Sequence, residues 1–464
     1  MAAVLGAGAA LWGLCLGLRP MGDNSALTHL ATGRLILEDG IPRHDPFSFT
    51  APGHAWTVYS WLASTGMALA ERAIGDNGIQ LSHAVLTMSL GLLAWLLTRP
   101  AGALAGRIVA VALVLVLGNS AWPERPLLVA LVLFALLILT VEREGPPWAI
   151  LPIMWVWVNV HGSFPLGVAY LLVRLVGRRI DGSDLRRLPS QAKMVLIGLL
   201  VAAINPLGPR LLIFPFELLG RHDILRRVQE WRSPDFSNRV NLLLLAAILL
   251  SILMAGRRGS WEDGLTALVF GAAACLAIRN IAPATLVLTP VLARALRGFG
   301  SIRGEERNRV TAVALAAIVG VGVVTTAVYL DGPAYDLAKY PEEQLAWMEA
   351  QGLLGERIAT QDFVGNYLTA RPGPKLKVFF DDRFDMYPRE VIRDSLRLLD
   401  GAEGWDESLD RHRVDVVLWR KGAPLGSILA VHPGWEIVQQ DKRWLIAVRR
   451  TAQSDAAKAV LAKA

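Results

Sequence analysis

The sequence predicts a polytopic α-helical membrane protein of about 11 transmembrane helices that ends in a small extracytoplasmic α/β domain. Three observations predict this fold class. Of the 464 residues, 53% are hydrophobic and 19% are charged, whereas ordinary soluble domains carry about a quarter charged residues. Apolar runs recur from residue 1 to residue 330. Residues 331–464 instead alternate charged helical stretches with β-branched runs.

Charge and cysteine content exclude several other classes. The net charge of +7 is unevenly placed, because residues 331–464 hold 19 Lys and Arg against 21 Asp and Glu, and residues 1–330 hold 28 against 19. The positive excess therefore belongs to the membrane part, where loop arginines orient the chain and meet lipid phosphates. No nucleic acid is expected as a partner. Cys15 and Cys275 both lie in apolar runs, which excludes a disulfide scaffold.

Eleven apolar runs are interpreted as membrane spans. The run 310–330 has no charged residue over 21 positions, which is long enough to cross a bilayer as a helix. Segments 147–177 and 262–297 hold two runs each in 31 and 36 residues, whereas two full crossings need roughly 40. We predict hairpins that turn inside the protein, below the membrane surface; the alternative is one long tilted span for each segment. The expected spans are 2–18, 79–97, 101–118, 127–141, 148–160, 165–177, 194–204, 241–256, 264–278, 281–297 and 310–330.

Arginine-rich loops orient the chain. Loops 178–193, 257–258 and 294–309 are basic and fall on one face, which the positive-inside rule makes cytoplasmic. An odd number of spans from a cytoplasmic N-terminus then puts residues 331–464 outside. Loop 205–240, on the opposite face, carries six arginines, and we predict that it holds a surface helix at the lipid headgroups.

The chain divides into two predicted domains. Residues 1–330 form the transmembrane domain, in which 19–78 is the first outer loop and 56–74 is an amphipathic helix lying on the membrane. Residues 331–464 form the α/β domain. Its predicted helices are 341–351 and 388–400, and its predicted strands are 376–380, 414–419, 435–440 and 444–448.

On this topology, polar residues of several loops face the outer side. Asp23 follows the first span at the membrane–water boundary, and the tips of both short hairpins carry polar residues in apolar surroundings. Ionisable groups near membrane depth are costly and are therefore candidates for function. Glu230 and Trp231 are interpreted as an interfacial anchor. The candidates are Asp23, His29, Arg34, His44 and Asp45 in the first outer loop, and Glu124, Arg125, Asn159, His161, Arg210, Arg279 and Asn280 in the later loops and tips.

Three stretches carry recognisable patterns. The first outer loop contains Asp23, His29, Gly33, Arg34, Ile36, Gly40, Pro42, Asp45, Pro46, Phe47, Ser48, Thr50, Gly53, Trp56, Trp61 and Leu62. Residues 157–167 read WVNVHGSFPLG, and residues 379–388 read FFDDRFDMYP. Together they resemble bacterial members of the GT-C superfamily, which are multi-span glycosyltransferases that use polyprenyl-phosphate sugars. The resemblance is to mannosyltransferase- and arabinosyltransferase-like members, in a subgroup without an assigned substrate.

The resemblance implies a GT-C-like transmembrane domain and an inverting transfer of one sugar. The donor would be a polyprenyl-phosphate sugar, and the acceptor an envelope polysaccharide, a glycolipid or a protein outside the membrane. In such enzymes the acidic residue of the first outer loop is the general base on the acceptor hydroxyl. This role falls on Asp23, with Asp45 as the second catalytic candidate.

The other candidates suit phosphate binding. Arginine pairs with phosphate oxygens through a planar fork, and the order of preference is Arg279, Arg125, Arg210 and Arg34. The remaining candidates for donor binding are His29, His44, Glu124, Asn159, His161 and Asn280. His161 is expected to donate to phosphate, or to hold a metal ion together with Asp45, His44 or His29. The sequence assigns no cofactor and leaves a divalent metal open.

Two other functions fit part of the pattern. A transporter or flippase of a lipid-linked substrate also uses broken, short hairpins, although no repeat relates the two halves of this chain. A non-catalytic membrane scaffold for envelope assembly would present the outer domain to wall-building partners.

Overall fold

The computed structural model describes residues 1–119, 122–221, 227–300, 309–371 and 376–463. The chain forms two compact units. The helical unit comprises Met1–Met21 and Tyr59–Tyr335, and the α/β unit comprises Gly22–Val58 and Asp336–Ala464. Residues 22–58 were expected to belong to the membrane part, whereas in the structure they pack with the C-terminal residues.

A short backbone pairing explains this grouping. The amide of Val378 donates to the carbonyl of Phe47 at 2.9 Å, and the amide of Phe49 donates to the carbonyl of Val378 at 3.1 Å. The hydroxyl of Thr50 donates to the carbonyl of Phe379 at 2.6 Å. Most of the first outer loop is therefore part of the α/β unit.

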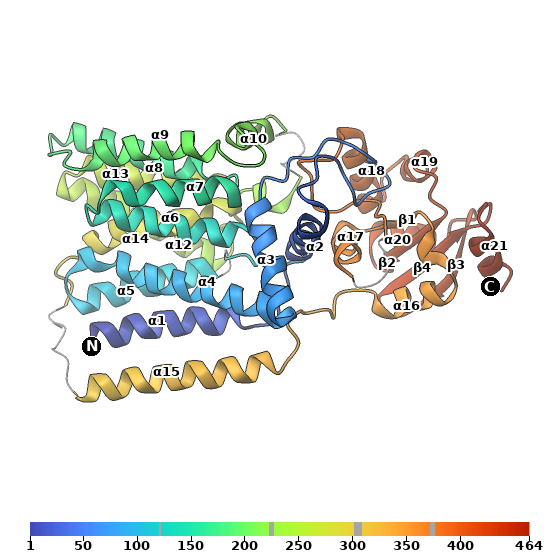
Figure 1. Cartoon of the computed structure of the whole chain (residues 1–464), viewed down its shortest axis with the longest axis horizontal. Coiled ribbons are helices and arrows are strands. Elements are labelled where there is room, and N and C mark those ends of the chain that lie inside the picture. Colours follow the sequence, from blue (N-terminus) through green and yellow to red (C-terminus); the bar gives the residue numbers. More distant parts are fainter. Residues whose placement is uncertain (120–121, 222–226, 301–308, 372–375, 464) are drawn as a thin grey trace. The chain divides into compact units, whose positions relative to one another are not determined.

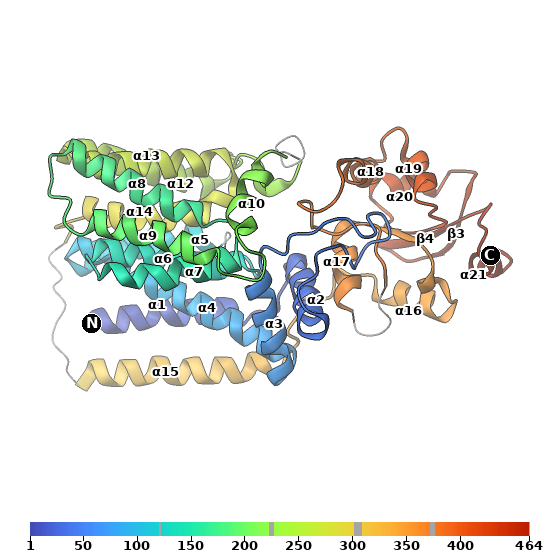
Figure 2. The same cartoon turned by 45° about the horizontal axis from the view of Figure 1, so that its top comes forward.

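The helical unit is a bundle of apolar helices whose axes are nearly aligned, except for α3 and α10, which run across the common direction (Figures 1 and 2). A helix overlaps each expected span. The helices are α1 (Ala2–Gly17), α3 (Trp61–Ile74), α4 (Asp76–Leu97), α5 (Leu104–Asn119), α6 (Leu127–Glu142), α7 (Ile150–Val160), α8 (Pro165–Ile180), α9 (Leu188–Ala202), α10 (Arg210–Leu219), α12 (Arg239–Arg258), α13 (Trp261–Leu276), α14 (Ile281–Ala295) and α15 (Arg309–Leu330).

The number of membrane crossings stays a prediction. In the described part of the chain, three segments are long and apolar enough to cross a membrane, namely 76–101, 239–258 and 309–330. Others are shorter: α1 and α6 have 16 residues each. At 1.5 Å per residue such a helix is about 24 Å long, less than the roughly 30 Å of a bilayer core.

Local sequence sets the two predicted hairpin turns. The helix α7 ends at Val160, His161 is extended, and Pro165 begins α8. Proline suits the first turn of a helix because its missing amide hydrogen has no intrahelical partner there. The helix α13 ends at Leu276 before the extended residue Ala277. The one-turn helix η4 (Ile278–Asn280) then leads into α14.

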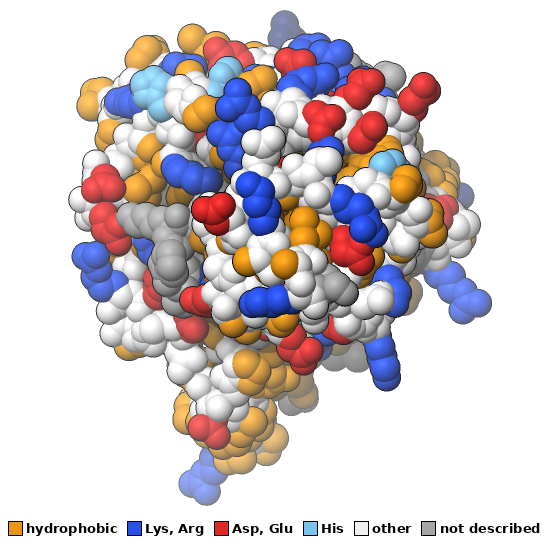
Figure 3. Space-filling model, turned by 90° about the vertical axis from the view of Figure 1, so that its right-hand side faces the viewer, with side chains coloured by type: hydrophobic (Ala, Val, Ile, Leu, Met, Phe, Trp, Pro, Cys, Tyr) orange, Lys and Arg blue, Asp and Glu red, His pale blue; other side chains and the backbone are white. Residues whose placement is uncertain are grey.

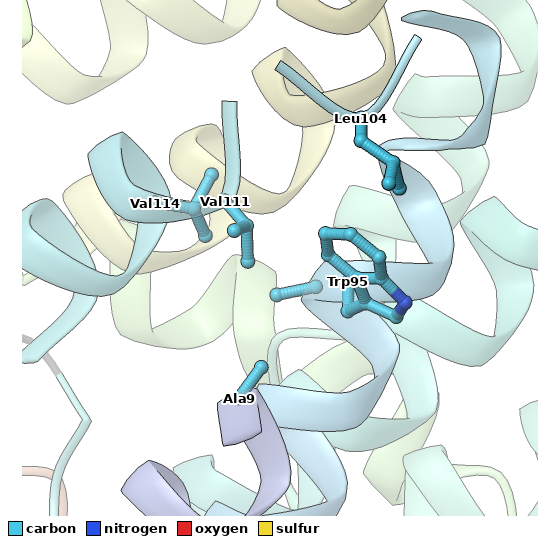
Figure 4. Close-up of a cluster of buried hydrophobic side chains, with 6 residues drawn as sticks. Ala9, Trp95, Leu104, Val111 and Val114 are labelled. Atoms are coloured by element: carbon cyan, nitrogen blue, oxygen red, sulfur yellow. The ribbon is translucent and has the colours of Figure 1, made fainter. Parts of the chain in front are cut away.

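Close backbone contact fixes α1 against α4. A Cβ added at Gly13 would lie 2.2 Å from the carbonyl oxygen of Thr87, and one at Gly91 would lie 2.2 Å from that of Ala9. Only glycine permits such an approach of two helices. Figure 4 shows the adjoining apolar cluster of Ala9, Trp95, Leu104, Val111 and Val114, contributed by α1, α4 and α5.

The α/β unit contains a four-stranded sheet with the order β1-β2-β4-β3. The strands are β1 (Ile358–Thr360), β2 (Val416–Arg420), β3 (Trp435–Gln440) and β4 (Trp444–Arg449). The strand β1 pairs parallel with β2, whereas β4 pairs antiparallel with β2 and β3. The helices are α2 (Asn24–Asp39), α16 (Glu342–Ala350), α17 (Asp362–Ala370), α18 (Arg389–Asp400), α19 (Trp405–Arg411), α20 (Pro424–Leu429) and α21 (Asp455–Leu461).

Three of the four predicted strands are confirmed, and the strand predicted at 376–380 is wrong. That segment makes only an isolated bridge between Val378 and Ser48. Its Phe379 and Phe380 are fully buried, so the apolar run reflects packing rather than a ladder. The sheet instead uses β1, whose three residues are too few to give a periodic signal.

The surface of the molecule carries both signs of charge. On the face in Figure 3, Lys and Arg side chains are interspersed with Asp and Glu. This agrees with the near balance of 19 basic and 21 acidic residues in 331–464.

A buried carboxylate joins two helices of the α/β unit. Asp394 accepts hydrogen bonds from Ser408 at 3.0 Å and Arg411 at 2.7 Å, and its Oδ2 lies 3.0 Å from His412 Nε2. Burial alone would raise the pKa of Asp394, but the hydrogen bonds from His412, Arg411 and Ser408 outweigh it and the pKa lies below its usual value.

We expect Asp394→Asn to lower the local stability of α18 and α19 by about 1.5–3 kcal/mol at pH 7, because charge-assisted hydrogen bonds are lost. A lowered carboxyl pKa stabilises the folded state fully above the unfolded pKa of about 3.9, and this contribution is lost as pH falls through the folded value. The difference between the two proteins should therefore shrink below about pH 4. Hydrogen exchange of the backbone amides of α18 and α19 measures it; equal protection at pH 7 would contradict the expectation.

Candidate functional site

The tips that were predicted to face the outer side lie at one end of the bundle. Successive long helices run in opposite directions, so that segments 122–126, 161–164 and 277–280 share an end (Figures 1 and 2). The helices α3 and α10 lie at this same end. Contacts of Arg125 and Arg279 with residues 229–231, which are far from both in the sequence, define the candidate site of this unit.

Two predicted arginines belong to one group of side chains. The guanidinium Nη2 of Arg125 forms an ion pair with Oε1 of Glu230. The guanidinium carbon of Arg279 lies 4.2 Å from the ring centroid of Trp231. Because Glu230 and Trp231 are adjacent in the one-turn helix η3 (Gln229–Trp231), a single short element holds both arginines. We call Arg125, Glu230, Trp231 and Arg279 the arginine cluster.

Electrostatics links the members of the arginine cluster. Burial lowers the pKa of Arg279 below its usual value, and the nearby charge of Arg125 lowers it further. The charges of Glu230 and Tyr59 act in the opposite direction and raise it. Arginine nevertheless stays charged at pH 7. In the described part of the chain, no carboxylate lies within ion-pair distance of Arg279. The amide of Ile278 donates to the carbonyl of Arg232 at 3.0 Å, which fixes η4 beside η3.

An aromatic wall adjoins the tip of the first hairpin. Tyr59 stacks on Phe214 of α10, with ring centroids 4.6 Å apart, and meets the ring of His161 edge-on at 6.0 Å. The amide of Ser163 donates to His161 Nδ1 at 3.1 Å. If that ring is neutral, this contact leaves the proton on Nε2, which can then act as a hydrogen-bond donor.

Both predicted asparagines form hydrogen bonds that hold the tips in place. Trp61 Nε1 donates to Asn159 Oδ1 at 2.9 Å, and Asn159 Nδ2 donates to the carbonyl of Trp155 at 2.7 Å. Asn280 Nδ2 donates to the carbonyl of Ala273 at 2.9 Å. Asn159 and Asn280 therefore position the backbone beside His161 and Arg279.

The remaining candidates of the helical unit lie outside the arginine cluster. Glu124 is half-buried and precedes Arg125 in the chain. Arg210 is exposed at the first position of α10. The role of Arg210 in binding phosphate stays a prediction.

In the α/β unit, Asp23 caps the first turn of α2. Its Oδ1 accepts from the amide of Ser25 at 3.0 Å, the usual contact of an N-cap aspartate. The hydroxyl of Ser25 donates in turn to Oδ2 of Asp382. The amide of Asp382 donates to Asn366 Oδ1 at 3.0 Å. Ser25 thus bridges two carboxylates that are far apart in the sequence.

Tyr340 lies within electrostatic reach of both carboxylates. Burial raises the pKa of Tyr340, and the charges of Asp23 and Asp382 raise it further. The ring stacks on Tyr367 with centroids 4.6 Å apart, and Lys339 Nζ donates to the carbonyl of Gly22. The phenol therefore stays a neutral hydrogen-bond donor near Asp23 and Asp382.

Asp45 belongs to a buried ion network. It is 6% exposed and accepts from the amides of Phe47 at 3.0 Å and Ser48 at 3.1 Å. Its Oδ1 lies 2.8 Å from Nη2 of Arg383, whose guanidinium also pairs with Asp381 at 2.7 Å. These contacts tie the loop around Asp45 to the segment 381–383.

The other candidates of the first outer loop are spread along it. Arg34 Nη1 donates to the carbonyl of Ala370 at 2.7 Å and so anchors α2 to the end of α17. His29 is half-buried on α2, and His44 is exposed in a bridge with Ala55. Within the described ranges, no three His, Cys, Asp or Glu side chains are grouped to hold a metal ion.

Sequence reasoning missed four of the residues at these sites. Glu230 and Trp231 were interpreted as an interfacial anchor, yet they contact Arg125 and Arg279. Neither Tyr59 nor Ser25 was among the candidate residues chosen from the sequence. One signal was available: Glu230 lies among the arginines of loop 205–240, and an acid in such surroundings commonly has an ion-pair partner.

The fold is similar to that of solved oligosaccharyltransferases. A structure of AglB from Archaeoglobus fulgidus, in complex with an inhibitory peptide and a dolichol-phosphate, matches with a TM-score of 0.55 at 11% identity. A structure of the Archaeoglobus fulgidus oligosaccharyltransferase tethered to an acceptor peptide with the NVT sequon matches with 0.54 at 12%. Each match covers 90% of this chain and 69% of the other.

These likenesses establish the fold class. AglB has the GT-C fold, and this chain shares it. Three helical segments in the described part of the chain are also long and apolar enough to cross a membrane. No protein-family model matches the sequence, and no curated protein sequence matches it.

Proposed function

We propose that this protein is a membrane glycosyltransferase that moves a sugar from a polyprenyl-phosphate donor to an extracytoplasmic acceptor with inversion. The arginine cluster carries the proposal, because segments far apart in sequence bring two guanidinium groups to one end of a GT-C bundle. The shared fold supports it, since one of the AglB structures contains a dolichol-phosphate.

Arg125 and Arg279 bind the phosphate of the donor. Both are permanently charged, and a guanidinium matches phosphate oxygens in two places. Stacking on Trp231 holds the guanidinium of Arg279 in one plane. A positioned cation stabilises the charge that develops on phosphate as the glycosidic bond breaks. His161, beside Tyr59, adds a neutral or charged donor.

Asp23 removes the proton from the acceptor hydroxyl. That oxygen attacks the anomeric carbon from the face opposite the phosphate, and the sugar–phosphate bond breaks as the new glycosidic bond forms. One displacement of this kind inverts the anomeric centre. The donor leaves as a polyprenyl phosphate, and the proton rests on Asp23. Positioned general bases contribute about 10²–10⁴ in rate.

A donor panel tests the proposal. Membranes that contain the full chain are incubated with polyprenyl-phosphate hexoses and pentoses carrying a radiolabelled sugar, together with envelope extract. We expect label to move into an acceptor with one donor at least. In Arg279→Gln the rate should fall about 100-fold or more, as for loss of one donor to a developing oxyanion.

Arg297→Gln is the matched control. Arg297 is exposed and follows α14, whereas Arg279 precedes it, so the control removes the same charge at the other end of one helix. Equal losses in both variants, or none in Arg279→Gln, would remove the arginine cluster from phosphate binding. Uptake of labelled donor into liposomes without covalent product would favour a transporter instead.

A further inference from the structure

We infer that Glu230 sets the charge preference of the arginine cluster, so that the site favours a lipid with one phosphate over a lipid diphosphate. The inference rests on the proposed function, because it assumes that Arg125 and Arg279 meet the donor phosphate. It adds a specificity-determining residue and narrows the class of donor.

The geometry places a carboxylate among the phosphate-binding cations. Glu230 contacts the guanidinium of Arg125 directly, and the next residue in η3, Trp231, stacks on Arg279. The side chains of Arg125 and Glu230 are 26% and 36% exposed, so an incoming anion can approach both. A phosphate bound to Arg125 therefore lies near the carboxylate of Glu230.

Electrostatics then makes Glu230 discriminate between anions. The energy of two charges scales with their product, so a diphosphate feels about twice the repulsion from Glu230 that a singly charged phosphodiester feels. Two arginines without the carboxylate would instead favour the more highly charged ligand. Glu230 offsets part of this preference while Trp231 keeps Arg279 in position.

A purely structural role explains the ion pair less well. Partly exposed ion pairs contribute only about 0–1 kcal/mol to stability, and the neighbouring hydrogen bond from Ile278 to Arg232 already holds η3 beside η4. We therefore expect variants of Glu230 to fold. Their elution in size-exclusion chromatography and their thermal unfolding should match those of the unaltered protein.

Direct binding measures the preference. The purified full chain in detergent is titrated with a polyprenyl-phosphate hexose, which carries one negative charge, and with a polyprenyl-diphosphate hexose of equal chain length, which carries two. The measured quantity is the ratio of the affinity for the diphosphate to the affinity for the monophosphate. In Glu230→Gln this ratio should rise on the order of tenfold, which is within the range of couplings between close charges. The change should shrink at high salt, because ions screen a partly exposed site.

Two further variants separate charge from shape. Glu230→Asp keeps the carboxylate and should keep the preference of the unaltered protein. Glu217→Gln removes an exposed acid from α10 and should leave the ratio of affinities unchanged. An unchanged ratio in Glu230→Gln, or equal changes in Glu230→Asp and Glu230→Gln, would overturn the inference.

Arg279→Gln distinguishes this failure from that of the proposed function. If both probes bind Arg279→Gln as tightly as the unaltered protein, the arginine cluster is not the phosphate site and both proposals fall. If Arg279→Gln weakens both probes but Glu230→Gln leaves their ratio unchanged, only the role of Glu230 is overturned.

Discussion

Replacing Asp23 by Asn should lower the rate of sugar transfer by about 10²–10⁴-fold, because the amide cannot accept the proton of the acceptor hydroxyl. The change is close to isosteric. Asparagine caps helices about as well as aspartate, so its side-chain oxygen still accepts from the amide of Ser25. The helix α2 should therefore begin at the same residue, and the loss should appear in kcat rather than in folding.

Asp39→Asn is the control for Asp23→Asn. Asp39 is the exposed last residue of α2, so both variants lose one carboxylate from the same helix. Initial rates with the donor identified by the panel measure the effect, and hydrogen exchange of α2 reports its folding. Full activity of Asp23→Asn, with α2 intact, would exclude Asp23 as the base. Equal losses in both variants would mean that the overall charge of α2 is responsible.

The bundle and its hairpins were predictable from local sequence. The apolar runs give the helices, and the lengths of 147–177 and 262–297 show that each pair is short. The extended residues His161 and Ala277 then lie where the hairpins were expected to turn. Such features depend on neighbouring residues, which a single sequence displays.

The grouping of the first outer loop with the α/β unit was not predictable in this way. It depends on hydrogen bonds between Phe47 and Val378 and on the bridge from Ser25 to Asp382. Each joins residues more than 300 positions apart in the sequence. The apolar run 376–380 gave a strand signal because burial and strand formation both select apolar residues.

The arginine cluster was predictable only in part. Arg125, in a loop between two expected spans, and Arg279, at a hairpin tip, were selected as ionisable groups near membrane depth, and the alternation of the spans put them at one end. Glu230, the ion-pair partner of Arg125, lies in a loop whose path cannot be predicted from the sequence. The same unit contains a second polar cluster that no tip motif indicated, at the opposite end of the helices.

That second cluster joins four helices. Arg174 of α8 pairs with Glu142 of α6 at 2.7 Å and with Glu262 of α13 at 2.6 Å. Arg294 of α14 pairs with Glu142 at 2.6 Å and with Asp263 at 2.7 Å. Arg174 is 2% exposed and Glu142 is 9% exposed, which contrasts with the accessible pair of Arg125 and Glu230. Each charge has an opposite partner, so this network stabilises the bundle rather than offering a site.

Removing one member of the network should therefore destabilise the protein strongly. In Glu142→Gln, the buried guanidinium of Arg174 and the partly buried one of Arg294 lose a shared carboxylate. Breaking a buried pair costs about 3–5 kcal/mol. We expect the unfolding temperature in detergent to fall by roughly 10 °C. Fluorescence-detected unfolding of the full chain measures it.

Glu144→Gln is the matched control, because its ion pair with Arg186 is exposed and should be worth at most about 1 kcal/mol. The pair also lies close to Glu142 in the sequence, so the two variants differ mainly in burial. A double variant, Glu142→Leu with Arg174→Met, should recover part of the loss, since apolar side chains of similar size replace a buried pair at little cost. Equal unfolding temperatures for Glu142→Gln and Glu144→Gln would contradict a buried network, because desolvation is what makes an unpaired guanidinium costly.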